Sequence, residues 1–306
     1  MDSERRAELE EARQAFALNG TTKEILQVIA SASPWVVDCL ALLAVQMGNT
    51  HAFKLCVREG CPIGENCVIQ AASMGHLAIL QELLALPELQ RLTRGHIAVA
   101  YAAAHGRNEV IQTFVIDGPL ARYVNEESTF QAARFGHLLT LKLLCERFQI
   151  GIEVRGIIEA CEKGYVHIVH YSLCSAGDAL TAEDIRRCAV AAAGNGHLAI
   201  MEILSMHFRF RPHEEIAMAA ARSDNVFCIQ YLERTGCLPI TSRVFLSAPA
   251  KGIVRDYLFA TAPEINRGNW SLAVEGGDRG HARLFIHATA AAVLLCGALV
   301  TLRRRS

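Results

Sequence analysis

The feature that most constrains this chain is a short phrase, Ala-Ala-x-x-Gly-His, that returns at nearly constant spacing. Its three clearest copies begin at Ala71, Ala132 and Ala192, and an apolar run follows each. The glycine of the phrase, or Asp224 in its place, marks ten units: Gly20, Gly48, Gly75, Gly106, Gly136, Gly164, Gly196, Asp224, Gly252 and Gly280. The mean interval, (280 − 20)/9, is close to 29 residues. Chance matches would not keep this period, so the sequence predicts an array of stacked repeats.

Each unit carries the pattern of two helices joined at the glycine. Before the glycine lies a run of small residues, as in residues 97–104. After it, apolar residues recur four, five, eight and nine positions on, which lines one face of an α-helix. The third unit fills these places with Ile79, Leu80, Leu83 and Leu84. The fifth unit has Thr140 in the first of them. Glycine suits the junction because a helix C-terminus often needs a positive φ.

Helix-start signals agree with these units. Thr181 and Asp184 have the spacing of a variant capping box, which predicts a helix N-terminus there. Asn125, followed by two glutamates, predicts another capped start. Pro212, followed by Glu214 and Glu215, opens the eighth helix pair. Pro249 falls inside the first helix of the ninth unit, so that helix should be short or kinked.

The extended phrase Ala-Ala-x-x-Gly-His-x-x-Ile-x-x-x-Leu-Leu resembles the ankyrin repeat over roughly residues 12–287. The family has a period of about 33 residues, a Thr-Pro-Leu-His tetrapeptide and a β-hairpin between units. This chain has a shorter period and lacks that tetrapeptide. The shortening falls between units, so we expect short or absent hairpins. The resemblance implies an all-α solenoid of about ten helix-turn-helix units that binds proteins.

The resemblance also places the candidate binding residues. In ankyrin-like arrays, the two variable positions between Ala-Ala and Gly-His face the concave side. Arginine and aromatic side chains anchor protein interfaces, which makes Phe135 the most suggestive residue, either exposed or folded back onto its own repeat. Trp35 and Trp270 lie nearer the ends and are predicted to be packing residues. The candidate partner-binding residues are Met74, His105, Arg134, Phe135, Glu162, Lys163 and Arg222.

Composition restricts the partners and the compartment. Thirty Lys and Arg against 31 Asp and Glu give a net charge of −1, without the basic excess that nucleic-acid binding requires. The partner is therefore expected to be a protein. Eleven cysteines without a C-x-x-C pair, several at core positions, predict reduced, buried thiols in a reducing intracellular compartment. No apolar run follows Met1, so no signal peptide is expected. Residues 3–18 predict a polar first helix that caps the array.

No catalytic pattern with specificity is present. The chain lacks G-x-S-x-G, P-loop and H-E-x-x-H motifs, and no interval between units is long enough to house an inserted site. Cys161 and Cys188 have basic neighbours, as many inert thiols do. The prediction is therefore that the protein is not an enzyme and uses no cofactor.

The repeated histidines do not predict a metal site. His76, His137, His197 and His281 share one register, and repeats stack about 10 Å apart, too far for two such imidazoles to share one ion. We expect them to bond neighbouring backbone at the helix junction instead.

The C-terminal segment departs from the repeat pattern. Residues 284–302 are 19 residues without Asp, Glu, Lys or Arg, followed by three arginines. A helix of that length spans about 28 Å, close to the hydrocarbon thickness of a bilayer. Three interpretations stay open: a tail anchor, a protruding helix that docks a partner or a second copy, and an extended packed cap. Its main apolar residues are Leu284, Phe285, Val293, Leu294, Leu295, Leu299, Val300 and Leu302.

The sequence thus divides into a repeat array over residues 1–287 and an apolar helix over residues 288–306. The favoured function is a non-catalytic scaffold that binds a protein on the concave face of the array. One alternative is a membrane-tethered adaptor or host-directed effector anchored by the C-terminal helix. Another is a structural spacer.

Overall fold

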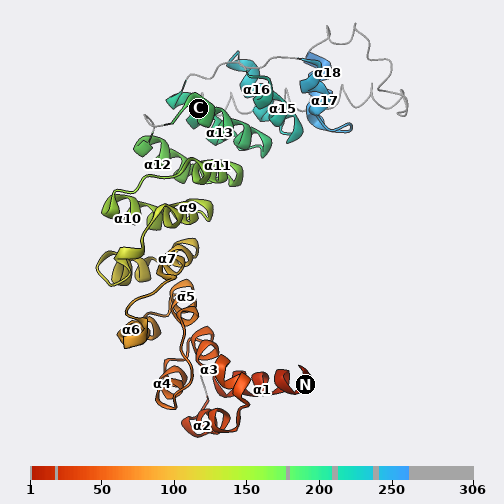
Figure 1. The fold of residues 1–306 in the computed structure, drawn as a ribbon. Coiled ribbons are helices and arrows are strands. Elements are labelled where there is room, and N and C mark those ends of the chain that lie inside the picture. The colour runs from red at the N-terminus through yellow and green to blue at the C-terminus, as the bar shows by residue number, and fades with distance from the viewer. Residues whose placement is uncertain (1, 18–19, 177–179, 209–212, 237–240, 262–306) are drawn as a thin grey trace, which may run out of the picture. The chain divides into compact units, whose positions relative to one another are not determined.

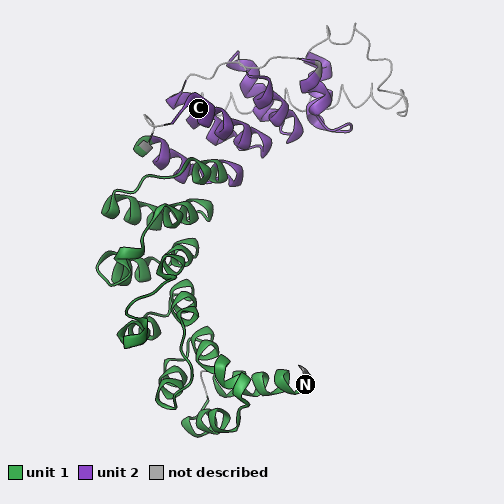
Figure 2. Cartoon of the chain, viewed as in Figure 1, with its two compact units in different colours: residues 1–160, 174–176 green, residues 161–173, 177–306 purple. Residues whose placement is uncertain are grey.

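The computed structural model describes residues 2–17, 20–176, 180–208, 213–236 and 241–261. Within these ranges the chain is helical and contains no strand. It divides into two compact units, drawn in different colours in Figure 2. Unit 1 consists of residues 1–160 with 174–176, and unit 2 consists of residues 161–173 with 177–306.

The helices follow the predicted order, two for each described repeat glycine or its substitute (Figure 1). Unit 1 contains α1 (Asp2–Ala15), α2 (Thr22–Ser31), α3 (Pro34–Gln46), α4 (Thr50–Arg58), α5 (Glu65–Met74), α6 (Leu77–Ala85), η1 (Pro87–Leu89), α7 (Gly95–Ala104), α8 (Asn108–Val110), η2 (Ile111–Ile116), η3 (Ala121–Tyr123), α9 (Glu126–Arg134) and α10 (Leu138–Phe148). Unit 2 contains α13 (Ala182–Gly194), α14 (Leu198–His207), α15 (Glu214–Arg222), α16 (Val226–Arg234), α17 (Ser242–Ser247) and α18 (Ile253–Thr261). The helices α11 (Val154–Lys163) and α12 (Val166–Ala176) have residues in both units.

Each unit is built of two helix layers. In unit 1, the first helices α3, α5, α7 and α9 pack in succession, while the second helices α2, α4 and α6 form the other layer. In unit 2, α13, α15 and α17 form the layer of first helices, and α14, α16 and α18 form the layer of second helices. A helix therefore packs on its neighbours in its layer, and in pairs such as α3–α4, α5–α6 and α13–α14 the two helices of one repeat also pack on each other, as expected for a repeat solenoid.

The Ala-Ala-x-x-Gly part of the phrase lies at the C-terminal end of the first helices α5, α7, α9 and α13. In α7, Gly106 has a φ of +61°, its N–H donates to the carbonyl of Ala103, and the N–H of Arg107 donates to the carbonyl of Ala102. These two bonds form a Schellman motif, which satisfies carbonyls that the helix itself leaves unpaired. The predicted positive φ at the repeat glycines is thus confirmed in α7, and the two alanines supply the accepting carbonyls.

The residue after the glycine joins one repeat to the repeat before it. Nε2 of His137 donates to the carbonyl of Ala104 at 2.9 Å, and its ring lies on Gly106, where a methyl group would come within 2.5 Å of Nδ1. Nε2 of His197 donates in the same way to the carbonyl of Glu162, and its ring lies on Gly164. The predicted structural role of the register histidines is confirmed at both places.

Other residue types make the same junction contact elsewhere. Nε of Arg107 donates to the carbonyl of Ser73 at 2.8 Å, and Nδ2 of Asn225 donates to the carbonyl of Gly196 at 3.0 Å. The ring of His76 also lies on the glycine of the preceding repeat, Gly48, but Nε2 of His76 has no hydrogen-bond partner among the described residues. His281 lies outside the described residues.

The core lies between the two layers and follows the predicted register. Ile79, Leu80 and Leu83 of α6 are fully buried. In α10, Thr140 is equally buried, and its hydroxyl donates to Oδ1 of Asn108 at 2.6 Å. The polar residue at this core position is therefore satisfied by the preceding repeat.

Three of the predicted helix ends can be compared with the structure. Thr181 forms the predicted capping box with Asp184. Asn125 occupies the N-cap of α9, but its side chain accepts no bond from the helix backbone; instead it accepts from the hydroxyl of Ser128 at 3.3 Å. The predicted position of the helix start is therefore correct, but the predicted capping hydrogen bond is wrong. Helix α17 is short, as predicted, and ends at Ser247, two residues before Pro249.

The C-terminal predictions fall mostly outside the described residues. The apolar segment of residues 284–302, Trp270 and the last repeat glycine belong to the undescribed range 262–306. Among the helices that are described, none is both long enough and apolar enough to cross a bilayer.

Candidate functional site

The candidate binding residues of unit 1 come from three helices that pack in succession. Met74, His105 and Phe135 each stand one residue before the repeat glycine, at the ends of α5, α7 and α9. Met74 is 37% exposed and Phe135 is 45% exposed. We call Met74, Tyr101, His105, Arg134 and Phe135 the first-helix surface. Large side chains at equivalent places on packed helices give this surface apolar area that a partner could cover.

Phe135 is exposed, and Arg134 lies beside it. The Arg134 guanidinium carbon is 5.5 Å from the centroid of the Phe135 ring, within cation–π range. Nε of Arg134 also lies 3.7 Å from a carboxylate oxygen of Glu159. Of the two interpretations of Phe135, the exposed one is therefore correct. An arginine held next to an exposed ring is a combination that anchors many protein interfaces.

Tyr101 is the residue of this surface that sequence reasoning missed. It is 50% exposed, and its ring centroid lies 6.3 Å from that of His105. The signal was available, because Tyr101 precedes His105 by four residues and so shares its helix face. Burial, then the charge of Arg107 and the proximity of His137, lower the pKa of His105. This part of the surface therefore favours an uncharged imidazole beside the tyrosine.

The remaining candidates lie in unit 2. Glu162 and Lys163 end α11, Arg222 ends α15, and all three are exposed. Nε of Arg222 donates to the carbonyl of Met218 in its own helix. The structure places these charges at the ends of first helices, the same relative position as in unit 1.

Trp35 corrects one sequence prediction. It is 42% exposed, with the Arg5 guanidinium carbon 5.4 Å from its ring centroid, whereas the sequence predicted a packing residue. Its place at the second position of α3, directly after Pro34, leaves it outside the buried stripe of that helix.

The buried thiols of Cys56 and Cys161 do not offer a reactive thiolate, whereas the hydrogen bond with Cys56 lowers the pKa of Cys61. A hydrogen-bonding contact with Cys188, together with burial, raises the pKa of Cys161. Contact with Cys61 and burial raise the pKa of Cys56 in the same way. Both groups are therefore held in the thiol form, which is a poor nucleophile.

Two histidines outside the repeat register do meet. The rings of His170 on α12 and His207 on α14 lie edge to face with centroids 6.0 Å apart in unit 2. The sequence argument about stacking distance considered only the register histidines and missed this pair.

These features define an all-α solenoid of ankyrin-like helix pairs. A comparison with solved structures supports this class: the crystal structure of the human ASB11 ankyrin repeat domain matches with a TM-score of 0.51 and 18% sequence identity. The match covers 63% of this chain and 96% of that domain. Comparisons with protein-family models and with curated proteins found no match. Solenoids of this kind generally act as protein-interaction scaffolds, with extended binding surfaces.

Proposed function

We propose that the protein is a non-catalytic scaffold that binds a partner protein through its first-helix surface. The observation that carries the proposal is the row of exposed Met74, Tyr101 and Phe135 on three packed helices. Protein interfaces are enriched in aromatic residues, Met and Arg, and this row together with Arg134 contains all three types.

The two parts of the surface would act differently. Phe135 and Arg134 form the anchor, because an aromatic ring and a guanidinium already in contact lose little freedom on binding. Tyr101 on α7 and Met74 on α5 extend the apolar area onto the two first helices that precede α9. Glu162, Lys163 and Arg222 are expected to supply charges that favour particular partners rather than most of the affinity.

The test is retention of a protein from a lysate of the source cells by the immobilised full chain. A double variant, Arg134→Ala with Phe135→Ala, should weaken retention of a genuine partner by more than about tenfold, since interface anchors of this type contribute at least that much. Leu139→Ala is the matched control, because Leu139 is an exposed apolar residue on the second helix α10. Circular dichroism shows whether each variant keeps its helices.

A partner that binds wild type and both variants equally would place the binding site elsewhere on the chain. A partner lost by the control as readily as by the double variant would also contradict the proposal, because the effect would then not depend on the first-helix surface.

A further inference from the structure

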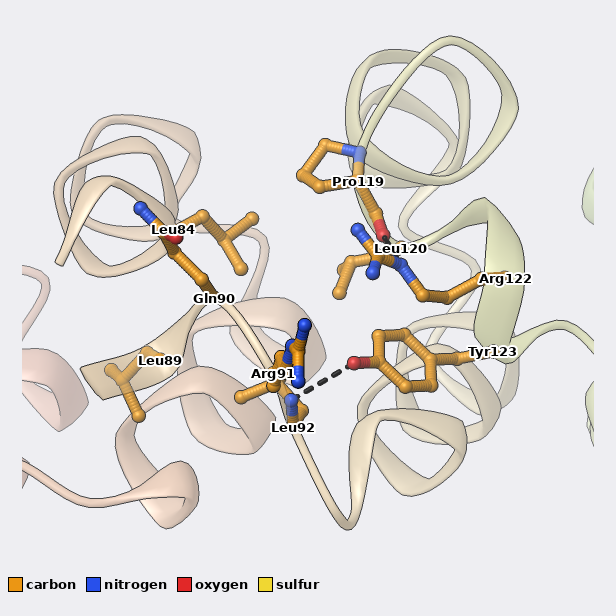
Figure 3. Close-up of a pocket in the computed structure, with 9 residues that line it drawn as sticks. All are labelled: Leu84, Leu89, Gln90, Arg91, Leu92, Pro119, Leu120, Arg122 and Tyr123. Atoms are coloured by element: carbon orange, nitrogen blue, oxygen red, sulfur yellow. Dashed lines mark hydrogen bonds between the residues drawn. The ribbon is translucent and has the colours of Figure 1, made fainter. Parts of the chain in front are cut away.

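A pocket away from the first-helix surface lies between two consecutive connectors of unit 1. The third connector covers residues 86–94 and the fourth covers residues 117–125. The intervals between repeat glycines that contain them are 31 residues (106 − 75) and 30 residues (136 − 106), longer than the preceding intervals of 28 and 27. The extra residues form η1 and η3 in place of hairpins. Between them is a pocket of about 360 Å³ (Figure 3).

The pocket has an apolar base. Leu89, Leu92 and Leu120 line it and are themselves buried, and Leu84 and Pro119 complete the apolar lining. Its volume is within the range of natural ligand pockets and leaves room for one large apolar side chain with part of its backbone. An occupant would therefore remove apolar surface from water here.

The pocket wall is fixed by Tyr123. Its hydroxyl accepts the N–H of Leu92 at 2.9 Å, which ties the fourth connector to the third (Figure 3). The ring also lies directly on Gly95, where a methyl group would come within 2.6 Å of it. Since both connectors are held, an occupant would meet a largely formed site and would have little ordering cost to overcome.

Two arginines supply positive charge at this pocket. Nε of Arg122 donates to the carbonyl of Pro119 at 3.2 Å, and its guanidinium carbon lies 5.7 Å from the Tyr123 ring centroid. Arg91 extends from the third connector into the space between the connectors (Figure 3). In the part of the chain that the structure describes, neither guanidinium forms an ion pair. The carboxylate of nearby Glu65 is engaged by the backbone N–H groups of residues 93 and 94 instead.

We propose that this pocket binds an extended peptide segment of a protein, in which an acidic side chain stands next to a leucine-sized apolar one. The apolar side chain occupies the leucine-lined base, and the carboxylate lies between the guanidinium groups of Arg91 and Arg122. The amide of Gln90, also at the pocket, can both donate to and accept from a peptide group. Arginine suits this role because its planar donors match a carboxylate.

The test uses the dye-labelled full chain on arrays of nine-residue peptides. Their central pair is Glu-Leu, Glu-Ser, Gln-Leu or Gln-Ser, and the flanking positions are randomised. We expect Glu-Leu peptides to bind at least about tenfold better than the other three sets, the size of one charge-assisted bond or one buried side chain. Arg91→Gln with Arg122→Gln should abolish that preference. Arg94→Gln is the matched control, because its side chain bonds Asn66 outside the pocket.

Several results would overturn the proposal. These are equal binding of all four peptide sets, a preference for Glu-Leu that survives the double substitution, and its loss in Arg94→Gln. Full competition by inorganic sulfate at the concentration of the peptide would show a simple anion site instead. The double variant Arg134→Ala with Phe135→Ala should keep the Glu-Leu preference, so failure here is distinguishable from failure of the first-helix surface. All three arginines are exposed, and surface substitutions of this kind rarely unfold a protein.

Discussion

Replacing Gly106 by alanine should be unusually destabilising, and for two separable reasons. The first is backbone strain. Gly106 has a φ of +61°, a conformation that costs an L-residue about 1–2 kcal/mol. The second is the next repeat: the new methyl group would lie 2.5 Å from Nδ1 of His137, so the ring must leave its place. That displacement breaks the bond from Nε2 to the carbonyl of Ala104, worth about 1 kcal/mol.

Gly60 provides the control for strain alone. Its φ is +76°, similar to that of Gly106, but a methyl group there would meet no atom within 4 Å. Gly60→Ala should therefore cost about 1–2 kcal/mol, and Gly106→Ala about 2–3 kcal/mol. The difference between the two substitutions isolates the contact between repeats.

A double-mutant cycle makes the same separation at one site. In a His137→Ala background the ring is absent, so Gly106→Ala should cost no more than Gly60→Ala does in the wild type. The coupling free energy between the two positions should be about 1 kcal/mol, as expected for residues in contact. The free energy of unfolding is measured by urea denaturation followed by circular dichroism. Amide hydrogen exchange over α7 to α10 locates the loss, because repeat arrays can unfold in stages.

Equal costs for Gly106→Ala and Gly60→Ala would refute the reasoning, since the histidine contact would then contribute nothing. A full cost of Gly106→Ala that persists without His137 would refute it as well.

Three further predictions concern pH, thiols and the C-terminus. Burial and the charge of a neighbouring arginine lower the pKa of His76 from its usual 6.5. The stability that neutral His76 contributes is therefore complete above pH 6.5 and is lost as the pH falls through the lowered pKa. His76→Gln should reduce the loss in free energy of unfolding between about pH 7.5 and pH 5.5, measured by urea denaturation at each pH. Iodoacetamide should modify exposed Cys174 at least about tenfold faster than buried Cys56 and Cys161, measured by peptide mass mapping, and equal rates would contradict the buried-thiol assignment. If the C-terminal segment is a tail anchor, the full chain should stay in the pellet after alkaline carbonate extraction while a chain ending at Gly280 is released; release of both would exclude an anchor.

The sequence predicted the helix pairs well because their determinants are local. Helix periodicity, the positive φ at the glycine and the box of Thr181 with Asp184 each depend on residues within a few positions of one another. Apart from those of the register histidines, side-chain bonds that reach a whole repeat away were not predicted. Thr140 read as a defect in the apolar stripe, although it bonds Asn108 across 32 residues of chain. No local sequence pattern predicts such a bond.

The same limit applies to the two candidate sites. The first-helix surface could be placed from the repeat register, because its positions recur one residue before each glycine. The solvent exposure of the Phe135 side chain could not be predicted, since it depends on how neighbouring helices pack. The pocket between connectors was invisible, because it arises where Tyr123 reaches back to Leu92 across 31 residues. Only the long intervals between repeat glycines hinted that these connectors differ.

The junction between repeats is formed by several residue types in this chain. What the junction requires is a side chain that reaches the preceding repeat, and space on the glycine to receive it. His137, Arg107 and Asn225 meet that requirement with three different chemistries, each by donating to a carbonyl of the repeat before. Asp224 reverses the arrangement: it holds the glycine position itself, at a φ of +53°, and its carboxylate accepts the N–H groups of Ile253 and residue 254 at the start of the next second helix. The physical constraint therefore lies on a contact and not on a residue type, so the identity of the residues can change while the stacking of the repeats is kept.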